Sequence, residues 1–447
     1  MNGSCRAAAA VSLFLLTGCS IIGGAGNPLP VTGFVVGDEP EAVRAGAAIL
    51  AHGGNAVDAV TATYFALSVT YPVAAGLGGG GLCIVHDPLH SRTEAFDFLP
   101  RELGKGGAYA VPGNVSGFSL LHTAYGRIPW QRVISPAESS AAAGFPISEA
   151  LAARLASSQD LIRLDAGLSA EFLDESGHVK PLGTIVAASA LADTLSQIRS
   201  QGPAALYRGA IASELVAYSR GEGGGITADD LAAYAPSRVA PNSIRIGDET
   251  VFLPPSPTGA GEFAAALLSH LVDSGGQPIG IENLAKSVAA ATKTTMDTFR
   301  LNSLPRDLGA TGFAAEDPDG LAVACAVTMD GPFGSAHTAT GTGITLASAP
   351  GSAQTGLAAA FLTPVIAKSS GGATSLAGAG AGGPNGTATI ALALLELAAG
   401  RDVTRPGVLH STGIAPYDTV NVIGCQNGIC TALPDPGAHG LGAAGVQ

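Results

Sequence analysis

Apolar residues recur at helical spacing near the start of the chain. An apolar run at 31–37 predicts a buried strand, and the residues that follow show the three-to-four-residue spacing of helices. We predict a helix from about Glu39 to His52 that ends at Gly53-Gly54, and a second helix from about Asn55 to Val69 that ends before Pro72. The second segment is apolar on most faces, so this helix is expected to be buried.

Further along, the pattern changes from mostly helical to mostly strand-like. Helices dominate the prediction for residues 108–240, where Thr227 before two aspartates is typical of a helix N-terminus. From residue 313 onward, strands are predicted at FAAED, LAVACAVTM, GITLASAP and TSLAGAGAGG, followed by a helix at ATIALALLELAAG. Strands toward both ends, with helices between and around them, predict a stacked α/β/β/α architecture.

The composition fits a folded domain and excludes one class of partner. The chain has 447 residues, of which 47% are hydrophobic and 13% charged, so it can bury a sizeable core. Its 62 glycines and 28 prolines lie between apolar segments, as expected for turns and close backbone approaches. The formal charge of -13 and the absence of a Lys/Arg cluster in the sequence argue against nucleic acid as a partner.

Residues 1–18 have the features of a secretory signal peptide. Arg6 precedes an apolar run, and the run ends in Leu-Thr-Gly before Cys19. This ending resembles a bacterial lipoprotein signal, so we expect a lipid on Cys19 that anchors the protein to a membrane. An ordinary signal peptide and a buried apolar segment are the alternatives. Ser20 is uncharged, which leads us to expect the outer membrane, with the protein facing the periplasm. Residues 19–30 are then a linker and residues 31–447 the domain.

The remaining cysteines are predicted to fall into two groups. Cys83 and Cys325 lie in strand-like apolar runs and are expected to be small core residues. Cys425 and Cys430 flank QNGI, in which Asn427-Gly428 is typical of a type I′ hairpin turn. Such a turn places the two cysteines opposite each other at a non-hydrogen-bonded position, close enough for a disulfide. The spacing would also suit zinc, but no His or second Cys pair stands nearby.

Five segments follow one another in order between residues 48 and 260: AILAHGGNAVDAVTATYFALSVTYPVAAGLGGGGLCIVHD, VPGNVSGFSLLHTAYGRIPW, PAESSAAAGFPIS, GGGITADDLAAY and LPPSPTGA. Together they resemble the γ-glutamyltranspeptidases, a family of N-terminal-nucleophile hydrolases. The resemblance implies a four-layer αββα sandwich, with a large-subunit-like region at 31–310 and a small-subunit-like region at 311–447. It also implies γ-glutamyl (glutathione-type) hydrolase or transferase activity, which needs no metal or cofactor.

The stretch that corresponds to the family's self-cleavage junction is GATGFAAEDPDG. In the family, the precursor cuts itself before a threonine that then acts as the nucleophile. Counting back without a gap from Asp317 and Asp319-Gly320 places Ala310 on the nucleophile and Thr311 on the residue after it. Alanine cannot attack a carbonyl carbon. Thr311 could serve only after cleavage between Ala310 and Thr311, and a shift of one residue in a strand turns a side chain to the opposite face.

The resemblance also places the remaining site residues. Besides Thr311, the catalytic positions are a threonine that supports the nucleophile and two glycines that would stabilise an oxyanion: Thr328, Gly382 and Gly383. The substrate-binding positions are Arg101, Asp330 and Ser352. Arg101 stands two places late after Asp-Phe, Asp330 replaces an asparagine and would repel a glutamyl carboxylate, and Ser352 replaces an acid. These departures remove most charge-specific contacts to a γ-glutamyl group.

Two hypotheses follow for the function. In the first, the protein is an exported enzyme that uses Thr311 to act on a small γ-glutamyl or peptide-like ligand and matures into two subunits. In the second, it is an uncleaved lipoprotein scaffold, or a ligand-binding protein, with the same fold and no catalysis. The sequence alone leaves both open because they share one fold.

Overall fold

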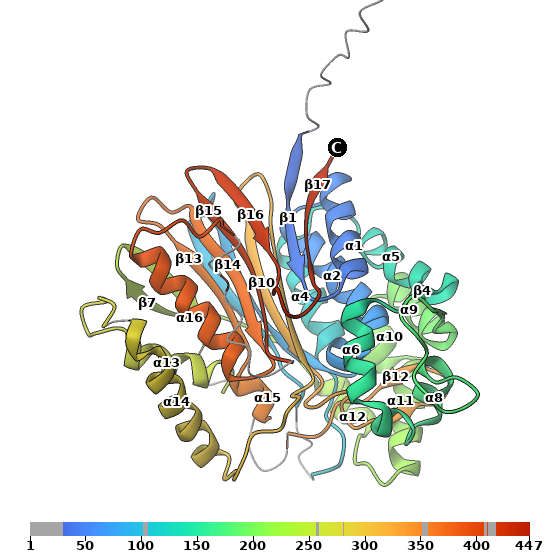
Figure 1. The fold of residues 1–447 in the computed structure, drawn as a ribbon. Coiled ribbons are helices and arrows are strands. Elements are labelled where there is room, and N and C mark those ends of the chain that lie inside the picture. Colours follow the sequence, from blue (N-terminus) through green and yellow to red (C-terminus); the bar gives the residue numbers. More distant parts are fainter. Residues whose placement is uncertain are drawn as a thin grey trace, which may run out of the picture.

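A computed structural model describes residues 30–101, 106–255, 259–279, 281–350, 356–405, 409 and 417–447. The predicted signal peptide, the lipidation site Cys19 and the substrate-binding candidate Ser352 lie outside these residues. Two sheets stack face to face, and each is covered on its outer side by helices (Figure 1). The predicted α/β/β/α layering is therefore confirmed.

The first sheet has seven strands, and every neighbouring pair is antiparallel. In spatial order the strands are β17 (Leu441–Val446), β1 (Val31–Gly37), β9 (Ala310–Glu316), β10 (Ala322–Thr328), β2 (Gly80–Asp87), β3 (Arg92–Phe98) and β6 (Ser237–Val239). The strand that starts at Ala310 thus lies near the centre of this sheet.

The second sheet has six strands, again all antiparallel. Their order is β16 (Ile429–Leu433), β15 (Thr419–Gln426), β14 (Thr374–Ala381), β13 (Thr363–Lys368), β8 (Glu249–Leu253) and β7 (Asn242–Ile246). Two small two-stranded ladders lie outside the main sheets: β4 (Phe145–Pro146) with β5 (Ile185–Val186), and β11 (Thr338–Ala339) with β12 (Ile344–Thr345).

Helices cover the outer faces of both sheets (Figure 1). On the side of the first sheet lie α1 (Pro40–Ala51), α2 (Ala56–Thr70), α3 (Pro72–Ala75), α4 (Asn114–Tyr125), α5 (Trp130–Ala143), α6 (Glu149–Ser157), α7 (Gln159–Ile162), α8 (Ala166–Phe172), α9 (Ser189–Gln201), α10 (Ala204–Arg208), α11 (Ala210–Gly221) and α12 (Ala228–Ala233). The second sheet is covered by α13 (Glu262–Leu271), η1 (Ile281–Asn283), α14 (Leu284–Thr298) and α16 (Pro384–Ala398), and α15 (Leu357–Ala360) is a single turn before β13. None of the described helices is both long and apolar enough to cross a membrane.

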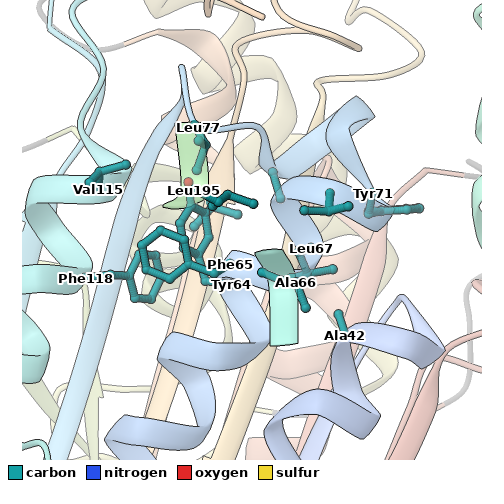
Figure 2. Packing of buried hydrophobic residues seen from close by; sticks show 14 of the residues in the cluster. Ala42, Tyr64, Phe65, Ala66, Leu67, Tyr71, Leu77, Val115, Phe118 and Leu195 are labelled. Carbon is teal, nitrogen blue, oxygen red and sulfur yellow. The ribbon is translucent and has the colours of Figure 1, made fainter. Parts of the chain in front are cut away.

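Helix α2 is buried along its whole length, as the sequence predicted. Asn55 caps its N-terminus in a capping box with Asp58. Aromatic side chains of α2 itself and apolar side chains of neighbouring helices form the main core (Figure 2), and the ring of Tyr64 stacks on that of Phe118 from α4 with centroids 4.1 Å apart. Each such ring, once fully buried, contributes about 1.5–3 kcal/mol to stability. This core holds the first sheet against its helical layer.

Small residues line the space between the two sheets. Gly312 on β9 faces Ala379 on β14 so closely that an added Cβ would lie 2.8 Å from the Ala379 Cβ. Other alanines from both sheets fill the same layer, including Ala314, Ala324 and Ala377. The high content of alanine and glycine therefore has a structural reason, because it lets the two sheets approach closely.

The hairpin at the end of β15 confirms the predicted turn and disulfide. Asn427 and Gly428 both have positive φ, at 53° and 78°, as a type I′ turn requires. Cys425 pairs with Cys430 in the strand register, and their sulfurs are bonded.

The prediction that Cys83 and Cys325 are small core residues was confirmed, but their disulfide was not predicted. They are directly opposite in the β2–β10 register and form a second disulfide across 242 residues of sequence. Both are fully buried in the main core, as small core residues would be. The pairing was missed because it depends on which strands become neighbours, and that is not visible in the local pattern around either cysteine.

Strand bounds were predicted less well than helix bounds. Strand β9 begins at Ala310, three residues before the predicted start, and only Ile344 and Thr345 of the predicted strand GITLASAP pair as a strand. Strands β7 and β13 were not predicted. β7 pairs with the next strand, β8, and β13 pairs with the next strand, β14, and with the distant β8. Cross-strand pairing thus decides their conformation more than local pattern does.

Candidate active site

The segment that leads into β9 is tightly held. Gly309 has φ of 59°, and an added Cβ would lie 1.8 Å from the carbonyl oxygen of Gly331, so only glycine fits here. Its N–H donates to Asp307 Oδ1 at 2.8 Å, and its carbonyl oxygen accepts from the N–H of Met329 at 2.8 Å. The peptide bond between Gly309 and Ala310 is thus fixed on both sides.

Thr328 lies against this junction. Its hydroxyl is 3.1 Å from the carbonyl oxygen of Gly309 and 3.2 Å from that of Leu308, and it can donate to either. In the strand register Thr328 is directly opposite Ala310. Thr328 therefore lies beside the peptide bond between Gly309 and Ala310.

Ala310 faces the other sheet. It is 1% exposed and belongs to an apolar cluster drawn from both sheets and from the loops at this end of the sandwich. The cluster consists of Leu82, Leu99, Ala260, Ala310, Ala326, Ala359, Leu362, Ala379 and Ala381. Leu99, the residue after Asp97-Phe98, takes part in it. The surroundings of Ala310 are therefore nonpolar.

Thr311 lies on the opposite face of β9, the face that meets the helical layer. Its side chain is fully buried, and its hydroxyl donates to Asp38 Oδ2 at 2.6 Å. The other oxygen of Asp38 accepts from Asn421 Nδ2 at 2.7 Å. The Asn421 amide also donates to the carbonyl oxygen of Gly312 at 2.9 Å, so this network ties β1, β9 and β15 together.

Asp38 is the acid that bonds to Thr311, and burial is the largest influence on its pKa. Burial raises the pKa of its carboxyl, while hydrogen bonds from Thr311 and Asn421 act in the opposite direction. A carboxyl group next to a threonine hydroxyl could in principle accept its proton. The sequence contained no signal for this contact, because Asp38 and Thr311 are 273 positions apart.

A buried ion pair fixes the segment just before the junction. Arg154 on α6 is 2% exposed, and its Nη2 donates to Asp307 Oδ1 at 2.7 Å. Its guanidinium also lies over the rings of Tyr71 and Tyr417, at 5.6 and 5.1 Å from their centroids. Sequence reasoning missed Arg154, which looks like any arginine on an amphipathic helix.

Asp330, one of the predicted substrate contacts, lies just beyond Thr328 in a left-handed conformation with φ of 55°. Neither of its carboxylate oxygens has a hydrogen-bond partner among the described residues. Burial raises the pKa of this carboxyl to about 7. Thr328 orients its backbone, because the N–H of Asp330 donates to the Thr328 hydroxyl at 2.9 Å.

Arg101, one of the predicted substrate contacts, forms an ion pair with Asp97 of the same chain. Its guanidinium donates to Asp97 Oδ2 at 3.0 Å, and the pair lies at the end of β3. The Asp97 side chain also accepts from the N–H of Leu99 at 3.0 Å. This turn explains how Leu99 enters the cluster around Ala310 while Arg101 remains partly exposed.

Gly382 and Gly383 connect β14 to α16. Gly382 has φ of 88°, and Gly383 precedes the first turn of α16. The carboxylate of Asp418 lies beside Gly383 and accepts from the N–H of Asn385 at 2.8 Å. The N-terminal end of α16, which would favour an anion, thus already faces a carboxylate of this chain, and burial raises the pKa of Asp418 to about 6.

A sequence model of the family described as Gamma-glutamyltranspeptidase matches residues 42–275, more than half of the chain. The chain belongs to the γ-glutamyltranspeptidase family. The matched region ends before β9, so the family match covers neither Ala310 nor Thr311.

Curated relatives agree with this assignment. Glutathione hydrolase 2 of Arabidopsis thaliana is 32% identical over 285 residues, which are 59% of this chain and 49% of that protein. The glutathione hydrolase proenzyme of Escherichia coli K12 is 33% identical over 261 residues, 54% of this chain and 45% of that protein. The chain thus spans about half the length of the curated relatives it matches.

The fold extends the likeness to nearly the whole chain. The crystal structure of cephalosporin acylase from Bacillus halodurans superposes with a TM-score of 0.71 at 18% identity, covering 96% of this chain and 99% of that chain. At this identity the likeness concerns the fold alone. It is the N-terminal-nucleophile hydrolase sandwich that the sequence predicted.

Proposed function

We propose that this protein is an exported, non-catalytic member of the γ-glutamyltranspeptidase family that binds a small peptide-like ligand or a protein partner. The observation that carries the proposal is the apolar cluster around Ala310, where an active member of the family needs a threonine hydroxyl. A nucleophile must reach its substrate, and no group in this cluster can attack a carbonyl carbon.

The charges near the junction support the same proposal. In its ionised form the Asp330 carboxyl would repel a glutamyl carboxylate, and the Asp418 carboxylate occupies the helix end that would otherwise favour an oxyanion. Loss of one oxyanion or positioning contact costs about 10²-fold in rate or more, and several are changed here.

A second function is favoured by one observation. Thr328 still directs its hydroxyl at the carbonyl oxygens before Ala310, as a self-cleaving member would require. In this alternative, Thr311 becomes the nucleophile after cleavage between Ala310 and Thr311, and the enzyme hydrolyses or transfers a γ-glutamyl group. Thr311 would then have to leave Asp38 and turn to the opposite face of β9.

The experiment that separates the two is a γ-glutamyl p-nitroanilide assay on the purified mature protein. Release of nitroaniline at the rate of the no-protein blank supports the non-catalytic proposal. Release that exceeds the blank and is lost in Thr311→Ala supports the enzyme. Asp229→Asn, on exposed helix α12, is the matched control, which should behave like the wild type in either case.

The proposal includes attachment to the cell envelope by a lipid on Cys19. Metabolic labelling with a fatty-acid analogue is expected to mark the wild-type protein and not Cys19→Ala. Equal labelling of both proteins would remove this part of the proposal and leave the rest unaffected.

A further inference from the structure

A groove of about 1130 Å³ lies at the end of the sandwich away from Ala310. It is formed where β9 ends, where β13 turns into β14, and by the β15–β16 hairpin and the β2–β3 turn. Both sulfur-bearing residues of the hairpin, Cys425 and Cys430, line it. This groove has no part in the proposed function.

The hairpin disulfide lies next to a buried acid. Glu316, the last residue of β9, has Oε2 only 3.0 Å from the sulfur of Cys425. Cys425 is 9% exposed, whereas Cys430 is only partly buried, and both line the groove. Glu316, Cys425 and Cys430 also form the one group of three metal-type ligands among the described residues, but their sulfurs are joined to each other.

Glu316 holds a proton at neutral pH. Burial, and to a smaller extent the neighbouring Asp317 charge, raises the pKa of its carboxyl to about 8. Its O–H can therefore point at the Cys425 sulfur. The other charged or titratable groups that line the groove are His86 on β2, Lys368 on β13, Asp248 and Glu249 at the β7–β8 turn, and Asp317 and Asp319 after β9.

We propose that Cys425–Cys430 is a thiol–disulfide exchange site for peptide dithiols that enter this groove, with Glu316 as the acid that protonates the departing Cys425 sulfur. Three observations converge on it: a disulfide on the wall of a large groove, one of its cysteines less buried than the other, and an acid against the sulfur of the more buried cysteine.

The exchange takes place in two balanced steps. A thiolate of the dithiol attacks the Cys430 sulfur, the Cys425–Cys430 bond breaks, and Cys425 leaves as it takes the Glu316 proton. The second thiol of the dithiol, as its thiolate, then attacks the mixed disulfide and releases Cys430 as a thiolate, which water protonates. One dithiol is oxidised to a disulfide, and one protein disulfide is reduced to two thiols.

The second disulfide of the chain is a matched internal control. Cys83 and Cys325 are both fully buried in the main core, so a thiol reaches them only after unfolding. Glu249 provides a matched control for the acid, since it is another carboxylate on the groove wall. A structural hairpin disulfide would need neither an accessible sulfur nor a proton donor.

The test is reduction of the folded mature protein by dithiothreitol without oxygen, between pH 6.5 and 9.5. Samples are alkylated at intervals, and peptide mapping reports each disulfide separately. We expect Cys425–Cys430 to be reduced while Cys83–Cys325 stays oxidised. The rate of Cys425–Cys430 reduction is divided by the concentration of dithiothreitol thiolate, which removes the effect of pH on the reductant. This normalised rate is expected to fall as pH rises through about 8, where Glu316 loses its proton.

Glu316→Gln keeps the size of the side chain but removes the acid. It is expected to lower the normalised rate at pH 7 by about 10²-fold, at the low end of what a positioned acid contributes, and to abolish the fall above pH 8. Glu249→Gln should change neither the normalised rate at pH 7 nor its fall above pH 8. Thermal melts of both variants verify folding.

Reduction of Cys425–Cys430 no faster than Cys83–Cys325 would overturn the proposal. So would a Glu316→Gln protein with the wild-type rate and pH profile. If Glu316→Gln does not fold, the pH dependence of the normalised rate in the wild type is the deciding measurement. A normalised rate that stays constant above pH 8 would show that Glu316 does not act as the acid. None of these outcomes depends on whether the protein acts on γ-glutamyl compounds.

Discussion

Ala310 and Thr311 are adjacent in β9, but their side chains meet different surroundings. Ala310 packs among alanines and leucines between the sheets, whereas Thr311 donates to the buried Asp38 on the helical side. A strand alternates its side chains, so no rotamer change can bring the Thr311 hydroxyl to the Ala310 side. On this account Thr311 is a structural residue that satisfies a buried carboxyl.

Thr311→Val is expected to lower the free energy of unfolding by about 1–3 kcal/mol, because it keeps the shape and leaves Asp38 with one partner fewer. Urea unfolding of the mature protein measures this. Thr61→Val, which removes a buried hydroxyl bonded to a carbonyl within α2, is the matched control and should cost less. Equal stability of Thr311→Val and the wild type would contradict a structural role for the hydroxyl.

Asp330 makes stability depend on pH. The pKa of its carboxyl is about 7 in the folded protein, against 3.8 normally, so the folded state holds its proton more tightly than the unfolded chain does. The resulting stabilisation of the folded state is fully present at pH values below the ordinary pKa of 3.8, and it is lost as pH rises through about 7. Asp330→Asn removes this titration and suits the left-handed backbone at this position.

Accordingly, Asp330→Asn is expected to be more stable than the wild type at pH 8, by on the order of 2 kcal/mol, and similar to it near pH 4. Thermal unfolding across this range tests the prediction. Glu175→Gln, at an exposed carboxylate, should show no such pH-dependent difference. A difference that is the same at both pH values would contradict the assigned cause.

At the scale of single elements, features that depend on neighbouring residues in sequence were predicted better than features that depend on the tertiary fold. The cap at Thr227 and the turn at Asn427-Gly428 are local, and both were predicted. The disulfide of Cys83 and the ion pair of Arg154 were not predicted, because only the tertiary fold brings their partners Cys325 and Asp307 close. The same holds for the candidate site: Thr328 was placed by sequence likeness, whereas the Asp38–Thr311 contact required the structure.

The two disulfides connect elements across very different distances in sequence, 242 positions for Cys83–Cys325 and 5 for Cys425–Cys430. Closing the longer loop restricts the unfolded chain more. Replacing both cysteines by alanine is expected to cost roughly 5 kcal/mol for the first pair and roughly 2 kcal/mol for the second. Chemical unfolding of the two double variants compares them directly, and a larger loss for the hairpin pair would contradict the argument.

At the scale of the whole molecule, the sandwich has two ends with different chemistry. At one end, the Arg154–Asp307 ion pair, Gly309 and Thr328 fix the entry to β9, and the space around Ala310 is apolar. At the other end, a groove carries a disulfide beside an acid. The family's fold is thus retained, and Ala310 at the start of β9 is part of the core.

The central claim is that the chain stays uncleaved at this junction. Intact-mass spectrometry of the denatured mature protein, with both disulfides reduced, tests it most directly. The account predicts one species that contains residues on both sides of Ala310, with Thr311→Val giving the same pattern. Two fragments that meet between Ala310 and Thr311, and that disappear in Thr311→Val, would contradict it.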